Sequence, residues 1–388
     1  MTPRFKPLVL VCVLALLATG CTTRRPQTEP RESPGRSRIT PPPRGKRAES
    51  VKPPTTPARD LLGRPGLVLG TNSDTWSSLV KSARTKGVVV LFSTPNGPGS
   101  KAKLERGDVI TSIADKPSTN SELAVVQLRG KIGESKKVQV TKPDNRKQTI
   151  TIKLEKAPDK SNLTETYYNK LVQESPNDAV LLYLRAQDTS NKANFDQRLA
   201  DLDKAINATP AGFVEALSLR ADVLWAQSLK RDVNADERTK LRQRAGDDWN
   251  VALREDPDNL RTLTSRSMAL ARLRRNEEAK RDADRAMKVD PTSPYAHYVS
   301  SVAETAVGRP AEAAGLARKA IDLAPYTIAY YVLLARLYGT RLARCPDAQK
   351  TVDAILPLTP KGPDQDLLNR AVASCKPGGG RSPTPRPE

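Results

Sequence analysis

The stretch NEEAKRDADRAMKVDP (residues 276–291) is followed, 34 residues further along the chain, by PAEAAGLARKAIDLAP (residues 310–325). Two alanines and a closing proline occupy equivalent positions in both: Ala279, Ala286 and Pro291 in the first, and Ala313, Ala320 and Pro325 in the second. Small residues at these positions allow two antiparallel helices to pack closely, and proline ends a helix because it has no backbone N–H. Each stretch is therefore predicted to be the second helix of a repeated helix pair.

The repeat extends through residues 160–375. Six prolines are separated by 34, 47, 34, 34 and 35 residues: Pro176, Pro210, Pro257, Pro291, Pro325 and Pro360. The charged segment SLKRDVNADERTK (228–240) accounts for the one long interval. A period of 34 resembles that of tetratricopeptide repeats. The resemblance implies an all-α solenoid of five helix pairs, preceded by a lone helix at LTETYYNKLVQESP (163–176) and closed by a C-terminal capping helix.

Residues 61–157 have a different pattern, in which short β-branched runs alternate with turn residues and two short helices. We expect a small, mainly-β domain here. The predicted strands are GLVLG (66–70), GVVVLF (87–92), DVITSIA (108–114), KKVQVTK (136–142) and QTITIKLEK (148–156), and the predicted helices are DTWSSLVKSAR (74–84) and SELAVVQLRG (121–130).

The run LERGDVI (104–110), followed by Ile113 and Pro117, resembles the PDZ domains of bacterial periplasmic proteases. The earlier RPGLVLG (64–70) resembles the carboxylate-binding loop and groove strand of that family. The sequence departs from the family at Lys103, where glycine is usual, and at 114–115, where Ala-Asp replaces the common Asn-Gly. These are turn positions, so the departures leave the expected fold unchanged.

The PDZ resemblance implies that an extended peptide adds to a sheet edge and that backbone N–H groups bind its carboxylate. The residues expected to bind the peptide are Pro65, Gly66, Leu67, Val68, Leu69, Leu123 and Val126, with Gly130 near the end of the same helix. Pro65 has no N–H, so one carboxylate donor would be missing and peptide binding would be weakened or altered. The alternative is a PDZ fold that serves only for packing or docking.

The N-terminal stretch LVLVCVLALLATGC (8–21) has about a dozen apolar residues, fewer than the roughly 20 that a membrane-spanning helix needs. It is typical of a secretory signal peptide over residues 1–20. Its end, LATGC (17–21), resembles a bacterial lipobox, although Ala18 stands where leucine is commonest. The resemblance implies that Cys21 is acylated and becomes the mature N-terminus. The alternative is an ordinary signal peptide, with Cys21 incidental.

The chain has a formal net charge of +21, and its prolines crowd into two segments. Residues 21–60 and the tail, 376–388, have few apolar side chains to bury and are predicted to be a disordered basic linker and a disordered tail. The linker either adheres to anionic headgroups or cell wall, or serves as a solvated spacer. Aromatic residues make up only 4% of the chain, which argues against stacking platforms for single-stranded nucleic acid, and we expect no nucleic-acid partner.

Three arginines occupy similar places in predicted first helices: Arg185, Arg220 and Arg266. They either line a groove that binds carboxylates or pair with acidic residues of neighbouring helices, and we favour the pairing. Cys345 and Cys375 flank two antiparallel helices at the end of the solenoid, so we predict a disulfide between them.

No combination of residues indicates catalysis. The single histidine, His297, lies in a repeat helix and is interpreted as structural. The segment NGPGSKA (96–102) lacks the Gly-Lys-Ser/Thr ending of a phosphate loop. We therefore expect a non-enzyme with no metal site and no cofactor.

The sequence as a whole predicts a lipid-anchored scaffold or assembly factor of the bacterial cell envelope, at the outer membrane and facing the periplasm. Its expected partners are other envelope proteins, bound through peptide or C-terminal segments, and the membrane through the N-terminal lipid. Two alternatives remain open: a regulatory adaptor of a periplasmic protease, and a binder of anionic cell-wall polymer.

Overall fold

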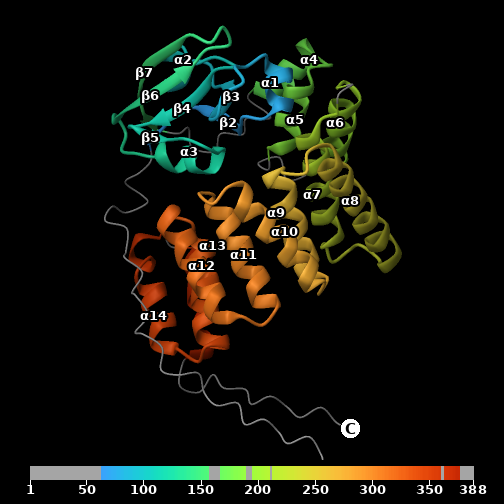
Figure 1. Ribbon diagram of the computed structural model, residues 1–388, viewed down its shortest axis with the longest axis vertical. Coiled ribbons are helices and arrows are strands. Elements are labelled where there is room, and N and C mark those ends of the chain that lie inside the picture. The colour runs from blue at the N-terminus through green and yellow to red at the C-terminus, as the bar shows by residue number, and fades with distance from the viewer. Residues whose placement is uncertain (1–62, 157–166, 189–194, 210–211, 360–361, 376–388) are drawn as a thin grey trace, which may run out of the picture. The chain divides into compact units, whose positions relative to one another are not determined.

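The computed structural model describes residues 63–156, 167–188, 195–209, 212–359 and 362–375, all of which belong to one compact unit of the chain. A small antiparallel β domain is followed by a region of helical repeats (Figure 1). The predicted fold class, a mainly-β domain before an all-α repeat region, is confirmed. The signal peptide, Cys21, the linker and the C-terminal tail lie outside the described residues. Within the described ranges, no helix is both long and apolar enough to cross a membrane.

The sheet of the β domain has the strand order β2-β3-β4-β6-β7, and every pairing in it is antiparallel. Its strands are β2 (Leu67–Thr71), β3 (Val88–Ser93), β4 (Val109–Ile113), β6 (Ser135–Thr141) and β7 (Lys147–Lys153), with β5 (Lys116–Pro117) paired to β4. A separate two-stranded ladder joins β1 (Gly63–Arg64) to β8 (Glu155–Lys156). Since β2 pairs only with β3 within the described sheet, its other edge is open to a further strand.

Two predicted elements end earlier than expected. The helix α1 (Asp74–Val80) stops before Arg84 because Lys81 adopts a left-handed conformation, with φ 53°. The predicted strand 148–156 is interrupted at Leu154, whose side chain is fully buried. The backbone of Leu154 exchanges hydrogen bonds with residues 133–134 instead of continuing the β6–β7 ladder.

Two further helices complete the β domain, α2 (Pro98–Lys101) and α3 (Ser121–Gln127). Asn120 caps α3, since its side chain accepts a hydrogen bond from the Leu123 N–H. Ala124 and Leu128 turn one side of this helix into the core of the domain, where they pack with Val88, Ile110 and other buried side chains of the sheet.

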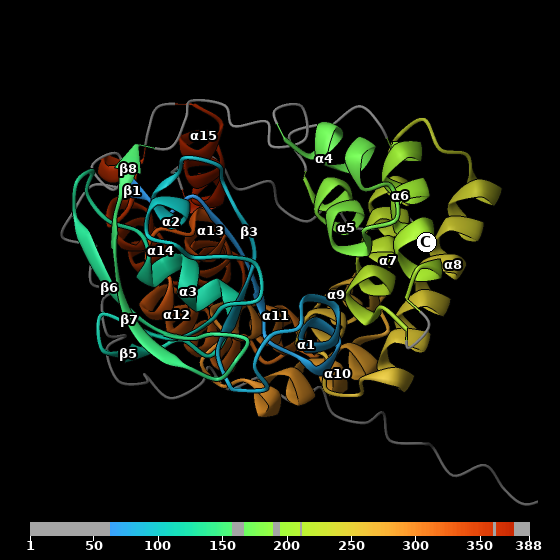
Figure 2. The same ribbon diagram turned by 90° about the horizontal axis from the view of Figure 1, so that it is seen from above.

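Five helix pairs follow the short helix α4 (Asn169–Glu174), as the period predicts (Figures 1 and 2). Within each pair the second helix returns antiparallel to the first and packs against it. The pairs are α5 (Ala179–Gln187) with α6 (Phe195–Asn207), α7 (Val214–Ser228) with α8 (Ala235–Glu255), α9 (Leu260–Arg272) with α10 (Asn276–Val289), α11 (Pro294–Ala306) with α12 (Pro310–Leu323), and α13 (Ile328–Arg336) with α14 (Cys345–Asp353).

The segment that accounts for the long interval lengthens one helix pair. Helix α8 has 21 residues, compared with 14 in α10 and in α12. Asn234 caps its start by accepting from the Glu237 N–H. Trp225 and Trp249 pack between the two long helices, with ring centroids 6.0 Å apart. Most of the additional residues thus extend helices and only a short turn remains between them.

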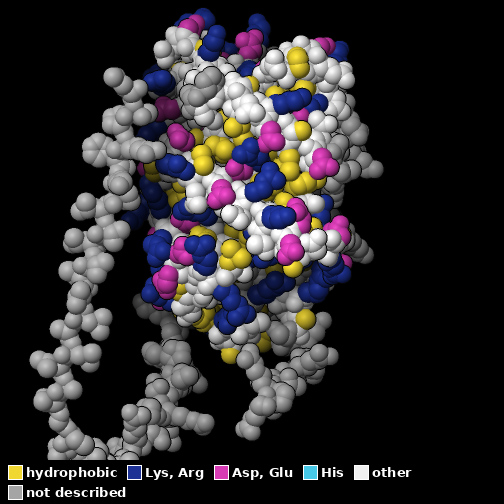
Figure 3. All heavy atoms as spheres, turned by 90° about the vertical axis from the view of Figure 1, so that its right-hand side faces the viewer, with side chains coloured by type: hydrophobic (Ala, Val, Ile, Leu, Met, Phe, Trp, Pro, Cys, Tyr) yellow, Lys and Arg dark blue, Asp and Glu magenta, His cyan; other side chains and the backbone are white. Residues whose placement is uncertain are grey.

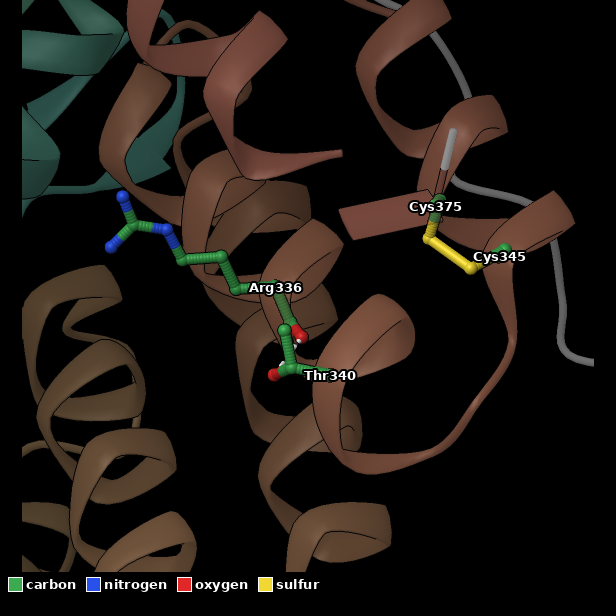
Figure 4. Close-up of a disulfide and its surroundings, with 4 residues drawn as sticks. All are labelled: Arg336, Thr340, Cys345 and Cys375. Carbon is green, nitrogen blue, oxygen red and sulfur yellow. Dashed lines mark hydrogen bonds between the residues drawn. A yellow bond between two sulfur atoms is a disulfide. The ribbon is translucent and has the colours of Figure 1, made fainter. Parts of the chain in front are cut away.

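The last pair ends differently from the others. The π-helix η3 (Leu337–Arg341) extends α13, and the Thr340 hydroxyl donates to the Arg336 carbonyl (Figure 4). The short 3-10 helices η4 (Leu356–Leu358) and η5 (Ala373–Cys375) flank the capping helix α15 (Pro363–Ala371). A disulfide joins Cys345 to Cys375, with Cα atoms 5.3 Å apart, as the antiparallel arrangement of α14 and α15 predicts.

Candidate functional site

The three predicted arginines form a repeated set of ion pairs between helices. In each, the guanidinium binds an aspartate of the second helix of its own pair through Nε and Nη2, at 2.6 to 2.8 Å: Arg185 with Asp201, Arg220 with Asp248, and Arg266 with Asp282. Nη1 reaches the helix before the pair, at Asn169 of α4, Asp203 of α6 and Asn250 of α8 respectively. The arginines therefore pair with neighbouring helices, and none of them lines the cavities described below.

Burial strengthens these contacts. The side chain of Asp201 is 1% exposed and that of Arg185 is 13% exposed. Hydrogen bonds to Asp248 raise the pKa of Arg220 above its ordinary value. A bidentate guanidinium–carboxylate contact has a fixed geometry, so each arginine sets the spacing between its two helices as well as balancing charge.

The β domain shares a hydrophobic core with the first repeats. Trp76 of α1 meets Tyr183 of α5 and Phe213 before α7, in each case edge-on with ring centroids 5.3 Å apart. Val89 and Leu91 of β3 belong to the same buried cluster. Since edge-on aromatic pairs contribute more than their area alone, this contact holds the β domain firmly against the repeats.

Helix α3 begins against the turn between α10 and α11. The Asn120 amide donates to Asp290 at 2.6 Å, and Glu122 accepts from the Ser293 hydroxyl at 2.9 Å and the Tyr295 N–H at 3.3 Å. Glu122 thus lies at the N-terminus of α11, where a carboxylate is stabilised by the helix dipole. Burial nevertheless raises the pKa of Glu122.

An apolar groove of about 380 Å³ adjoins the contact between α3 and the start of α11. Its walls come from the edge strand, from α3, and from the starts of α11 and α13 with the turn before α13. Its aromatic wall is made by Tyr295, Tyr326 and Tyr330. Val125 of α3 is 51% exposed, a large hydrophobic side chain open to this space. The other lining residues of the β domain are Leu69, Ser121, Glu122, Val126 and Arg129.

Among the predicted peptide-binding residues, Leu69 and Val126 line this groove. Leu67 packs on the core of the β domain, and Val68 packs on the core that the two regions share. Leu123 lines neither this groove nor the larger cavity described below, whereas Val125, which the sequence analysis did not select, lines the groove. The reason is the orientation of α3: with Ala124 and Leu128 in the core, the side chains facing the repeats are those at 121, 122, 125, 126 and 129.

The predicted carboxylate loop is anchored on α2. The Pro65 carbonyl accepts from the Gly99 N–H at 2.8 Å, and the Gly66 carbonyl accepts from the Thr94 N–H at 2.8 Å. Gly66 has φ +65°, and an added Cβ would lie 3.2 Å from the Pro98 ring. Glycine at this position therefore allows the tight turn into β2.

A second cavity, of about 830 Å³, adjoins the groove and shares Leu69, Ser121, Glu122 and Tyr295 with it. Six carboxylates and two cations line it: Glu122, Glu215, Asp222, Asp256, Asp258 and Asp290, with Lys86 and Arg261. No motif in the sequence marks these residues, because they come from both regions and meet only in the folded chain. The cavity is acidic although the chain carries +21.

Glu215 is the most deeply buried carboxylate of this cavity. The Ser73 hydroxyl, which also caps α1, donates to its Oε1 at 2.9 Å, whereas Oε2 has no hydrogen-bond partner. Burial raises the pKa of Glu215 to about 7. The carboxyl group is therefore only partly ionised at neutral pH.

We expect Glu215 to make stability depend on pH. Since its folded pKa lies above the ordinary 4.5, the folded state binds more protons than the unfolded state between about pH 4.5 and 7. The free energy of unfolding should fall over this window, by up to about 3 kcal/mol from this group, and stay level above it. In urea unfolding at pH 5 and pH 8, Glu215→Gln should lose most of that difference. An unchanged difference would contradict the raised pKa.

The remaining predicted features have structural roles. His297 is 5% exposed, with Nδ1 2.9 Å from the Ser293 carbonyl. Residues 98–101 form α2, so the glycine-containing segment 96–102 is part of the β domain. In the ranges that the structure describes, no three His, Cys, Asp or Glu side chains are placed to hold a metal ion.

No protein-family model and no curated protein matches the chain. Among the solved structures similar to it are two tetratricopeptide-repeat proteins and one protease. YrrB, a tetratricopeptide-repeat protein with an unusual peptide-binding site, is 17% identical over 53% of this chain and 97% of its own, with a TM-score of 0.35. A tetratricopeptide-repeat protein of Thermus thermophilus is 19% identical over 51% of this chain and 98% of its own, with a TM-score of 0.42. The HtrA-type protease AlgW with a decapeptide is 20% identical over 25% of this chain and 30% of its own, with a TM-score of 0.24.

Proposed function

We propose that this chain is a protein-binding scaffold of the bacterial cell envelope that captures an extended segment of a partner protein. The observation that carries the proposal is the apolar groove, because the open edge of β2, the exposed Val125 and the tyrosines of the repeats all face one space. An extended segment would pair with β2 through its backbone and place alternate side chains in the groove. The β domain would act here as a PDZ-like module.

The repeats contribute directly to the proposed site. Tyr295 and Tyr330 belong to α11 and α13, so the groove is complete only when the β domain is docked on the repeats. Tyrosine gives large contact area with little loss of side-chain freedom, which suits a surface that binds peptides. The two regions would therefore bind a partner as one composite site.

The envelope location is part of the proposal. It is supported by the signal-like segment 8–21 and its lipobox-like end at Cys21, which lie outside the described residues. A disulfide in the solenoid also fits an oxidising compartment such as the periplasm. On the face drawn in Figure 3, Lys and Arg side chains are interspersed with Asp and Glu side chains, so this face has no continuous basic patch for an anionic polymer.

We expect Val125→Lys to weaken peptide binding by about tenfold or more, since it removes apolar contact area and places a charge in the groove. The probe is a peptide selected from a library with free C-termini, and the measurement is a fluorescence titration. Ile132→Lys is the matched control, because Ile132 is also exposed (53%) on the β domain but does not line the groove. Equal affinities for the two variants would refute this site.

Partners in cells can be identified with a photo-crosslinking residue at position 125. Captured envelope proteins would support the scaffold, and a captured periplasmic protease would point to the adaptor alternative. The same experiment with Cys21→Ala tests the anchor, since loss of acylation should release the chain from the membrane fraction. If the Cys21→Ala chain is released from the membrane fraction but still forms the crosslinks, partner binding does not depend on the lipid anchor.

A further inference from the structure

The groove and the acidic cavity follow one another along β2. Leu69 lines both, and Gly70, Thr71, Asn72 and Ser73 then continue along the wall of the acidic cavity. From residue 69 to residue 73 an extended chain advances about 13 Å. A segment lying along β2 would therefore pass from apolar surroundings to acidic surroundings within about four residues.

Most carboxylates of the cavity have hydrogen-bond donors but no ion-pair partner among the described residues. Asp222 pairs with Arg261 at 3.0 Å, and Asp258 pairs with Arg285 at 2.9 Å. No ion pair within the described part of the chain involves the other four, Glu122, Glu215, Asp256 and Asp290. Of these four only Glu215 is fully buried, and the six carboxylates of the cavity outnumber its two cations, Lys86 and Arg261, which leaves a surplus of negative charge.

Glu215 provides a second, independent observation. It is 7% exposed, it lines the cavity, and its Oε2 has no hydrogen-bond partner. A buried acceptor with no donor is uncommon in folded proteins. Lys and Arg side chains both supply N–H donors and carry the missing positive charge, and their long stems reach from a backbone into a cavity.

From these observations we infer that the partner segment is bipartite, with apolar residues at its C-terminal end and Lys or Arg residues about four positions before them. This inference rests on the proposed function, since it assigns the chemistry of the segment bound there. We take the added segment to be antiparallel to β2, in keeping with the sheet, in which every pairing is antiparallel. A segment continuing this alternation on β2 has its C-terminal side near Leu67 and its upstream side near Thr71 and Ser73.

The test uses synthetic decapeptides with free C-termini. The first has leucine at the last and third-last positions and lysine at the fifth and seventh from the end, so that all four side chains point to one side. The second has alanine in place of both lysines. The third exchanges the leucines with the lysines. We expect the first to bind at least tenfold more tightly than the second or third at pH 8, with an affinity that falls as salt increases.

Variants of the full chain locate the effect. Asp256→Asn combined with Glu215→Gln should weaken binding of the lysine peptide about tenfold and leave the alanine peptide unchanged. Asp364→Asn is the control, because Asp364 is exposed on α15 and lines neither cavity. If the first two peptides bind equally, or if the third matches the first, the bipartite inference is overturned while the groove stands. If a Val125→Lys change leaves all binding unaffected, the proposed function itself fails.

Discussion

Arg185→Ala should lower the free energy of unfolding by about 3–5 kcal/mol, the largest effect that we expect from a single substitution. The reason is that the substitution leaves the carboxylate of Asp201 buried without its counter-charge. Asp201 is 1% exposed and receives both arms of the guanidinium, at 2.6 and 2.7 Å. Without Arg185 its carboxylate remains buried, and among the described residues the Gln197 amide is the side-chain donor left to it. Chemical denaturation followed by circular dichroism measures the loss.

Two variants test this explanation. Arg285→Ala removes an ion pair whose side chains are 48% and 67% exposed, so it should cost less than about 1 kcal/mol. Replacing both partners, as Arg185→Met with Asp201→Leu, should recover much of the stability, because no uncompensated charge is then buried. If the double variant is as unstable as Arg185→Ala, lost packing rather than an unpaired carboxylate explains the effect.

Removal of the disulfide, by Cys345→Ser with Cys375→Ser, should cost about 3–4 kcal/mol in the unfolding of the last repeat. The cysteines are 30 residues apart, and opening a loop of that length restores entropy to the unfolded chain. The affected part contains α14 and α15, the last α-helices that the structure describes. Hydrogen exchange of this segment, with and without reductant, measures the change.

The effect of the disulfide should be local. Repeat proteins are stabilised by contacts between neighbours, so the β domain and α5–α8 should keep their protection. Peptide affinity tests the same point more sharply, because Tyr330 lies in α13, the first helix of the last pair. Unchanged affinity is expected, since the bond lies on α14 and η5 rather than on α13. A large loss of affinity would mean that the cap also positions the groove.

The helical repeats could be predicted because their signal is local and repeated. A 34-residue period of alanines and prolines is visible without any knowledge of long-range contacts, and all five helix pairs are present. The strands of the β domain were also accessible from β-branched runs. The boundaries of the elements were harder to predict. Helix α1 ends at Val80 because Lys81 adopts a left-handed backbone conformation, which its residue type does not indicate.

The groove was only partly predictable. The PDZ resemblance selects a strand and a helix that both contribute to the lining of the groove, but it does not determine which side of α3 faces the repeats. That choice depends on the docking of Ala124 and Leu128 in the core, and it moves the lining from Leu123 to Val125. The tyrosine wall could not be anticipated at all, because Tyr295 and Tyr330 lie about 170 residues or more beyond α3 in the sequence.

The sequence by itself indicated the two kinds of architecture, the pairing of the three arginines with neighbouring helices, and the disulfide between Cys345 and Cys375. These features depend on periodicity, turn residues and spacing, which act over a few tens of residues. Only the tertiary structure decided that the β domain shares a core with the repeats and that six carboxylates line one cavity beside an apolar groove. Such a site is made by side chains that are distant in the sequence, and their positions follow from packing between the two regions. Two contacts between the regions create it. Trp76 packs against Tyr183 and Phe213, and Glu122 binds the start of α11.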